Sequence, residues 1–266
     1  MDALTFPPSE SPFLEPYLPK TESKNGLPFT TLTFATSLDS SLALSPGTRT
    51  VLSGPQSKAM THYLRSRHDA ILVGAGTAVA DNPGLNCRIH GAGGYGGDGL
   101  RGQPRPIILD PSARWNFDES SKIFALSREG RGRAPWIFTA SGAYVPEEKR
   151  NLLERSGGKY IALDVIEGKV FDWADLLRRL KSEGLESVMI EGGGSVINSL
   201  LEPGFQHLVD SVIVTIAPTW LGQGGVVVSP KRRLDERGTA IAASRLKGVK
   251  WHPFGEDVVL CGRIGQ

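Results

Sequence analysis

The sequence predicts an α/β fold in which a mainly parallel central sheet is flanked by helices and followed by a C-terminal hairpin. Short β-branched and apolar runs alternate with segments of helical periodicity, an order typical of a parallel sheet covered on both faces. The chain has 266 residues, of which 39% are hydrophobic, enough for one sizeable core. Two glycine-rich turns also follow buried apolar runs, where α/β proteins bind ligands.

The first elements illustrate the pattern. Residues 30–35 are rich in β-branched side chains and bounded by polar turns, so they are predicted to form a strand. Residues 57–68 place Met60 and Leu64 at helical spacing and are predicted to form a helix. The short apolar run 70–73 then predicts a fully buried strand.

The same alternation continues to the C-terminus. Further strands are expected at 106–109, 136–139, 160–163, 187–190 and 211–217, and further helices at 146–155, 172–183 and 195–201. Residues 247–251 and 257–261 are expected to form the closing hairpin.

Two segments stand outside this alternation. Residues 1–27 are rich in Pro, Ser and Glu, and are expected to form an N-terminal tail that wraps the domain or stays mobile. One domain should then span residues 28–266. The glycine-rich stretch 91–99 is expected to be a mobile surface insertion, because its glycines do not stand between a strand and a helix.

Charge and cysteine content exclude several classes of function. With 30 basic and 28 acidic residues the net charge is +2, and the densest basic run, 231–233, is too short for a nucleic-acid footprint. Cys87 and Cys261 lie far apart without metal-binding spacing, and the histidines show none either. No apolar run approaches the ~20 residues of a membrane span. We therefore expect a reduced cytoplasmic protein without a metal, a nucleic-acid partner or a membrane partner.

The two glycine turns are Gly74-Ala75-Gly76-Thr77, after the strand 70–73, and Gly192-Gly193-Gly194-Ser195, after the strand 187–190. Neither is a Rossmann fingerprint, because Val79 stands where the first would need its third glycine. One such turn alone would usually be structural. Two of them, flanked by polar residues, favour a dinucleotide bound by another α/β architecture.

Polar residues beside these turns are candidates for ligand contacts. Asp39 follows the first strand, where capping a turn and holding a substrate group are equally open. Arg65 and Arg88 could bind a phosphate through two hydrogen bonds each, although either one alone would usually be a solvated surface residue. Glu191, beside three glycines, would repel a nucleotide phosphate, so it is expected to contact a substrate amine or hydroxyl.

Seven stretches carry a resemblance to a known family, in the family's order: 28–40, 60–65, 69–77, 80–87, 104–110, 188–193 and 216–222. Together they resemble the NADPH-dependent reductases of riboflavin biosynthesis, which convert 2,5-diamino-6-ribosylamino-4(3H)-pyrimidinone 5′-phosphate to its ribitylamino form. The fungal-type branch is the more similar one, because Ser40 stands where bacterial relatives typically have glycine.

The resemblance implies a dihydrofolate-reductase-like fold, a homodimer, NADPH as cofactor and a phosphorylated pyrimidine as substrate. It implies NADPH contacts at Ala35, Gly76, Thr77, Asp81, Gly193, Gly194, Ser195, Val196 and Ile197, and substrate contacts at Arg65, Leu85, Arg88 and Glu191. The chain departs from bacterial relatives at residues 49–51, and it lacks the H-x-E and P-C-x-x-C signature of the zinc deaminase fused to many of them.

For the reaction, we expect Arg65 and Arg88 to anchor the ribose phosphate and Glu191 to bind the ribose or the amine. Asp39 is the candidate for orienting the reacting end or relaying a proton. Two other functions stay open: a dihydrofolate-reductase-like enzyme that acts on a pterin, and a catalytically silent sensor that binds NADPH. A purely structural or interaction protein is disfavoured, because both glycine turns keep their polar flanks.

Overall fold

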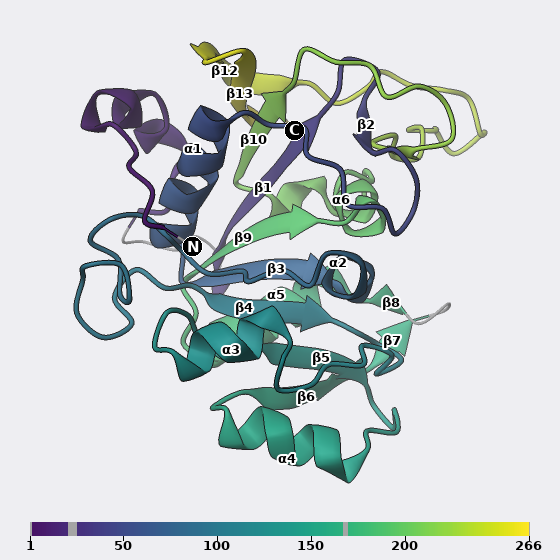
Figure 1. Ribbon diagram of the computed structural model, residues 1–266. Helices are drawn as coiled ribbons and strands as arrows, with labels where there is room; N and C mark the ends of the chain where they lie inside the picture. The colour runs from purple at the N-terminus through teal and green to yellow at the C-terminus, as the bar shows by residue number, and fades with distance from the viewer. Residues whose placement is uncertain (1, 21–25, 167–169, 266) are drawn as a thin grey trace.

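A central sheet organises the molecule (Figure 1). In the computed structural model, which describes residues 2–20, 26–166 and 170–265, this sheet has nine strands in the order β12-β13-β10-β1-β9-β3-β4-β5-β6. The pairings from β10 through β1, β9, β3, β4 and β5 to β6 are parallel, whereas β13 runs antiparallel to both β10 and β12. The predicted α/β fold, with its mainly parallel sheet and its C-terminal hairpin, is confirmed.

The element bounds are close to those expected from the sequence. The sheet strands are β1 (Phe29–Thr36), β3 (Ala70–Gly74), β4 (Arg105–Leu109), β5 (Trp136–Ala140), β6 (Lys159–Leu163), β9 (Ser187–Gly192), β10 (Ser211–Ile216), β12 (Leu246–Phe254) and β13 (Asp257–Ile264). The α-helices are α1 (Pro55–Ser66), α2 (Ala75–Asp81), α3 (Lys122–Arg128), α4 (Glu147–Arg155), α5 (Trp173–Ser182) and α6 (Gly194–Leu200). Two small ribbons pair β2 (Ser41–Ala43) with β11 (Val226–Val227), and β7 (Val165–Ile166) with β8 (Val170–Phe171). The described residues include the 3-10 helices η1 (Pro8–Phe13), η2 (Glu15–Tyr17) and η4 (Gln206–Leu208).

Helices cover both faces of the sheet, and the alternation of side chains along the strands explains how. In β3, Ala70 and Leu72 belong to the core shared with α5 and α6, whereas Ile71 and Val73 belong to the core shared with α2, α3 and α4. Successive side chains of a strand point to opposite faces, so a strand buried on both faces must be apolar throughout. Figure 1 shows α1 to α4 on the near face and α5 behind the sheet.

The sequence missed two short helices that border the site. α2 and α3 have seven residues each, and α2 includes Gly76. Seven residues are only about two turns, so helical periodicity is a weak signal there, and in α2 glycine lowers helix propensity further; α6 is equally short but was expected. Within the described ranges, no helix combines the length and the hydropathy that crossing a bilayer requires.

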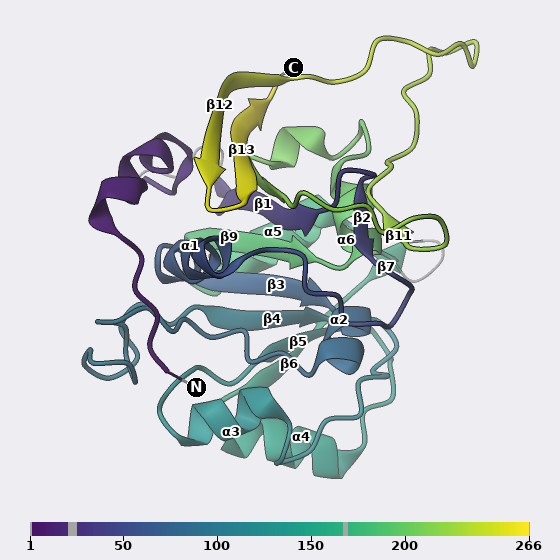
Figure 2. The same cartoon turned by 45° about the horizontal axis from the view of Figure 1, so that its top comes forward.

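The N-terminal residues pack onto the domain. Leu14, Tyr17 and Leu18, around η1 and η2, are buried in a cluster that also includes residues of α1 and β13. Figure 2 shows this segment beside α1 and the β12–β13 hairpin. Of the two behaviours that the sequence left open for the tail, residues 2–20 therefore wrap the domain. Residues 21–25 lie outside the described residues.

The stretch 91–99, expected to be a mobile insertion, is instead a tightly bonded loop. Ala92 and Tyr95 are buried, and the Gln103 amide donates to the Gly93 carbonyl oxygen at 2.7 Å. A Cβ at Gly93 would lie 2.2 Å from the carbonyl oxygen of Gly99. The glycines therefore serve the close approach of two backbone segments, which a composition-based prediction of mobility cannot detect.

A buried histidine predicts acid sensitivity. His68 contacts the Thr31 hydroxyl at 2.8 Å and the Leu64 carbonyl oxygen at 2.7 Å, and burial lowers its pKa to about 4. Between about pH 6.5 and pH 4, His68 is protonated in the unfolded chain but neutral in the folded chain. The contribution of neutral, buried His68 to stability is therefore intact above pH 6.5 and is lost as the pH falls toward 4. We expect His68→Gln to flatten the fall in unfolding free energy by about 1.4 kcal/mol per pH unit in that window. Urea unfolding at several pH values measures both slopes, and equal slopes for the variant and the wild type would contradict the assignment.

Candidate active site

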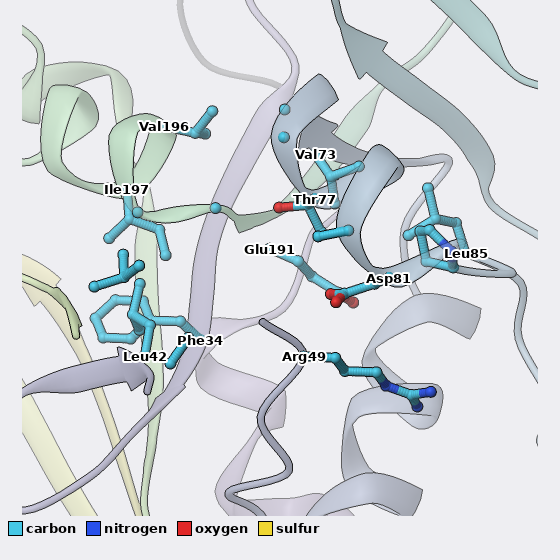
Figure 3. A pocket seen from close by; sticks show the side chains of 18 of the residues that line it. Phe34, Leu42, Arg49, Val73, Thr77, Asp81, Leu85, Glu191, Val196 and Ile197 are labelled. Carbon is cyan, nitrogen blue, oxygen red and sulfur yellow. The ribbon is translucent and has the colours of Figure 1, made fainter. Parts of the chain in front are cut away.

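A cleft of about 1150 Å³ lies beyond the carboxyl ends of the central strands. Its wall is formed by the ends of β1, β3 and β9, the first turns of α2 and α6, one side of α1 and the loop 45–53. Figure 3 shows side chains from these elements pointing into a common space. The volume exceeds the ~300–1,000 Å³ of ordinary small-molecule sites, so the cleft has room for two ligands side by side.

The two glycine turns expected from the sequence meet in this cleft. A Cβ at Gly74 would lie 3.2 Å from Cγ2 of Val196, and a Cβ at Gly193 would lie 2.9 Å from Oγ1 of Thr77. Each turn thus packs against the first residues of the helix that follows the other turn. Glycine is required because the two backbones approach each other closely, and the same closeness leaves a smooth wall facing the cleft.

The glycines after β9 serve different steric purposes. Gly192 has a φ of +118°, which side-chain-bearing residues rarely adopt, and the peptide between Gly192 and Gly193 is cis. A Cβ at Gly194 would lie only 2.3 Å from Cγ1 of Val226 in the β2–β11 ribbon. Part of the glycine requirement that the sequence attributed to a nucleotide is therefore internal packing.

All nine residues predicted to contact the cofactor line the cleft. They are Ala35, Gly76, Thr77, Asp81, Gly193, Gly194, Ser195, Val196 and Ile197. Asp81 is half-buried at the end of α2, and burial raises the pKa of its carboxyl while the nearby charge of Arg49 works in the opposite direction. Figure 3 shows the side chains of Asp81 and Glu191 directed into the cleft.

The four predicted substrate residues also line the cleft, and two of them bind each other. Arg65 of α1 donates to both carboxylate oxygens of Glu191, at 2.8 and 2.7 Å, and to the carbonyl oxygen of Asn86 at 3.1 Å. The two side chains are only 14% and 18% exposed. Burial by itself lowers the pKa of Arg65, but the attraction of Glu191 outweighs it and the pKa is raised. Sequence reasoning assigned both residues to a ligand and did not predict this ion pair, because they are far apart in the chain.

Arg88 has a different environment. It is only 7% exposed, its Nε lies 3.3 Å from Nε2 of His62, and its Nη1 donates to the carbonyl oxygen of Asp2 at 3.1 Å. Burial, followed by the charges of three neighbouring cations, lowers the pKa of His62 to about 2, so the imidazole is neutral at physiological pH. Among the described residues no carboxylate pairs with Arg88, and a buried guanidinium without an anion favours binding one.

Three more cations line the same part of the cleft, and the sequence did not single them out as ligands: Arg49, Lys58 and Lys122. Burial lowers the pKa of Lys122, and so do the charges of Arg49, Arg88, Lys58 and Arg65. Lys58 lies two helical turns before Arg65, so the periodicity of α1 could have placed them on one face. Lys122 carries no local signal, because only the packing of α3 brings it to the cleft.

Asp39 is the candidate that the structure does not bring to the cleft. Its carboxylate accepts from the backbone amides of Leu221 at 3.2 Å and Gly222 at 2.7 Å, and from the hydroxyl of Ser37. The hydrogen bond from Ser37, followed by that from Gly222, lowers the pKa of the carboxyl. Of the two uses that the sequence left open, this geometry supports the structural one, in which Asp39 joins the turn after β1 to the loop after β10.

Arg49, Lys58, Arg65, Arg88 and Lys122 form a basic cluster in the cleft. Together with the parallel sheet and the position of the cleft at its carboxyl edge, this cluster defines the class of the molecule: an α/β protein with a site for anionic small molecules. Residues 28–260 match the family described as RibD C-terminal domain, and the chain belongs to that family.

Two fungal relatives and one solved structure illustrate the similarity. The 2,5-diamino-6-ribosylamino-4(3H)-pyrimidinone 5′-phosphate reductase of Debaryomyces hansenii is 40% identical over 99% of this chain and 100% of its own length. The reductase of the same name from Saccharomyces cerevisiae is 40% identical over 96% of this chain and 95% of its own length. The solved structure of the Saccharomyces riboflavin biosynthesis reductase superposes with a TM-score of 0.74 at 37% identity, covering 96% of this chain and 99% of that chain.

Proposed function

We propose that this chain is a reductase that uses NADPH to convert 2,5-diamino-6-ribosylamino-4(3H)-pyrimidinone 5′-phosphate to its ribitylamino form. The observation that carries the proposal is a single cleft in which two glycine turns adjoin the Arg65–Glu191 pair and the uncompensated Arg88. The two fungal relatives described above are named for this activity, and this chain matches nearly their whole length. The basic cluster also favours a phosphorylated substrate over a pterin.

The residues of the cleft fit a nicotinamide dinucleotide. Ala35, Gly76 and Gly193 present little or no side chain, so a flat ring or a phosphate can approach the backbone, while the hydroxyls of Thr77 and Ser195 can donate to phosphate oxygens. When bound there, NADPH supplies the hydride that the substrate accepts. Ala35, Gly76, Thr77, Gly193 and Ser195 would hold the cofactor in the cleft that Glu191 also lines.

The basic cluster suits the other ligand. Arg88, with Lys58 and Lys122 beside it, would hold the 5′-phosphate, and Glu191 would contact the ribose or its amine. The open-chain imine of the substrate gains a hydride at C1′ and a proton at the attached nitrogen, which gives the secondary amine. A carboxylate close to that nitrogen favours the protonated imine, which accepts hydride more readily than the neutral form.

The proposed activity is tested by following nicotinamide absorbance with purified protein, NADPH and the freshly made ribosylaminopyrimidine phosphate. Oxidation that requires both ligands is the expected result. Oxidation with dihydrofolate instead would support the pterin reductase, and tight NADPH binding without oxidation by either compound would support the sensor.

A glycine substitution tests the cofactor wall. In Gly193→Ala the new methyl group would meet Thr77, and it would roughen the surface on which the dinucleotide lies. We expect the Kd for NADPH to rise about tenfold, which corresponds to ~1.4 kcal/mol. Gly204→Ala is the matched control, since nothing lies within 4 Å of the added Cβ. Nicotinamide fluorescence titration measures both variants, and an unchanged Kd in Gly193→Ala would refute this wall as the cofactor site.

The proposal includes a homodimer. β12 is an edge strand of the sheet, and it carries Trp251 and Val249, which are 61% and 40% exposed. A second copy of the chain that packs along this edge would cover both side chains. We expect Trp251→Arg to shift the sedimentation mass from dimer toward monomer, whereas Tyr144→Arg, at an exposed site away from this edge, should leave it unchanged. A monomeric wild type would exclude the dimer.

A further inference from the structure

The first residues of the chain bind the segment that carries Arg88. We define residues 2–6 as the N-terminal strap. The backbone amide of Leu4 donates to the carbonyl oxygen of Arg88 at 2.7 Å, and the amide of His90 donates to the carbonyl oxygen of Leu4 at 2.9 Å. These two bonds form a parallel bridge between Leu4 and Ile89. The strap therefore binds the backbone on both sides of Ile89.

The other side of this segment is fixed by the domain itself. The Gln103 side chain accepts from the amide of Cys87 at 2.8 Å and donates to the Cys87 carbonyl oxygen at 2.7 Å. Arg88 thus follows a residue held by Gln103 and is itself held by the strap. Without the strap, the segment around Arg88 would lose its hydrogen bonds to Leu4 and would keep those of Cys87 to Gln103.

An aromatic anchor holds the strap in place. Phe6 stacks on Tyr63 of α1 with the ring centroids 4.6 Å apart, and it is almost fully buried. Phe254 of β12 also packs against the Phe6 ring, and these two ring centroids are 5.9 Å apart. Figure 2 shows the chain descending beside α1 toward the N-terminus. The strap is fixed at Phe6, and its bonds to residues 88–90 lie beyond that anchor.

The strap also binds the charged group directly, and through a neutral atom. The carbonyl oxygen of Asp2 accepts from Nη1 of Arg88 at 3.1 Å, which orients the guanidinium without neutralising it. His62 alone cannot orient the guanidinium of Arg88. Its two ring nitrogens face the backbone amide of Arg88 at 3.1 Å and Nε of Arg88 at 3.3 Å, and a neutral imidazole accepts at only one nitrogen.

We propose that the N-terminal strap is a positioning element for the anionic substrate: it orients the Arg88 guanidinium toward the cleft while leaving its charge available for a phosphate. This inference rests on the proposed function, in which Arg88 binds the 5′-phosphate. From the sequence, the strap was expected only to be part of the N-terminal tail. Asp2 and Leu4 act through Arg88 and are positioning residues.

Two variants separate this role from general stability. Deletion of residues 2–5 removes the contacts of Asp2 and Leu4 but keeps the Phe6 anchor. Leu4→Pro removes the amide that donates to Arg88, and it replaces the Leu4 side chain, which packs against the hydrophobic cluster around Phe6, with the proline ring. Thr5→Pro is the matched control, since the Thr5 amide has no hydrogen bond to any described residue. Steady-state kinetics with both ligands, thermal unfolding, and calorimetric titration with inorganic phosphate are measured for each.

We expect the deletion to raise the KM for the phosphorylated pyrimidine and the Kd for inorganic phosphate about tenfold. Leu4→Pro should raise both by about threefold or more, with the KM for NADPH and the unfolding temperature close to wild type. Thr5→Pro should match the wild type. Unchanged phosphate affinity in both variants would overturn the proposal, and so would a parallel loss of NADPH and phosphate affinity together with a lower unfolding temperature. If the wild type itself shows no substrate-dependent oxidation, the proposed function fails, whereas the phosphate titration still decides the role of the strap.

Discussion

Replacing Glu191 with Gln is expected to lower kcat for the phosphorylated pyrimidine by about a hundredfold or more, with less than about threefold change in the Kd for NADPH. Glu191 holds Arg65 through two hydrogen bonds in a largely buried part of the cleft. Truncating one member of such a pair costs ~2–5 kcal/mol, and about 2.7 kcal/mol corresponds to a hundredfold in rate. The variant also removes the carboxylate that would favour the protonated imine, so the loss should fall on kcat.

Single-turnover kinetics and fluorescence titration with NADPH measure the two effects separately. Glu202→Gln is the matched control, because Glu202 pairs with Lys231 outside the residues that line the cleft. Equal losses of turnover and of NADPH affinity in Glu191→Gln would show that Glu191 supports the whole cleft, and would remove it as a group acting on the substrate.

Replacing Arg88 with Met is expected to raise the KM for the phosphorylated pyrimidine by up to about a hundredfold. Hydrogen bonds to a charged partner contribute ~1.5–3 kcal/mol, or about ten- to a hundredfold in affinity. Met keeps much of the side-chain volume, so His62 and the strap should lose little packing. The kcat with saturating substrate should change far less than KM, because Arg88 is assigned to binding and not to the transferred atoms.

The dephosphorylated substrate supplies the decisive comparison. If Arg88 binds the phosphate, Arg88→Met should not raise the KM for the dephosphorylated substrate. The KM of Arg88→Met for that substrate should then equal the KM of the wild type for it. Arg128→Met is the control for removing a cation, since Arg128 is exposed and does not line the cleft. An equal rise in KM for both substrates would contradict the assignment.

Local sequence determined most of the fold. The strands β3 and β9 were evident because a strand buried on both faces must be a short, uninterrupted apolar run, and such runs here are bounded by turn residues. The two glycine turns were predicted for the same reason, since each follows one of these runs. The resemblance to the riboflavin reductase family, carried by stretches from Pro28 onward, is confirmed by the family match to residues 28–260.

The sequence alone was less informative where a role depends on partners distant in the chain. It could not separate the two uses of Asp39, because both need a carboxylate after a strand. The fold favours the turn-capping use by bringing the Gly222 amide within hydrogen-bonding distance of the Asp39 carboxylate. In the same way, the stretch 91–99 was expected to be mobile from its composition, although its glycines allow two backbone segments to touch.

In the candidate site, too, local sequence predicted some features and contacts between distant residues decided others. The sequence by itself determined which residue types stand at the carboxyl ends of the strands, because strand ends and helix starts are encoded within a few residues. Only the tertiary structure decided that Arg65 pairs with Glu191, that Lys122 joins the basic cluster and that the strap binds Arg88. Those contacts join residues separated by dozens of positions, and burial with the exclusion of water sets their energies, neither of which a local pattern encodes.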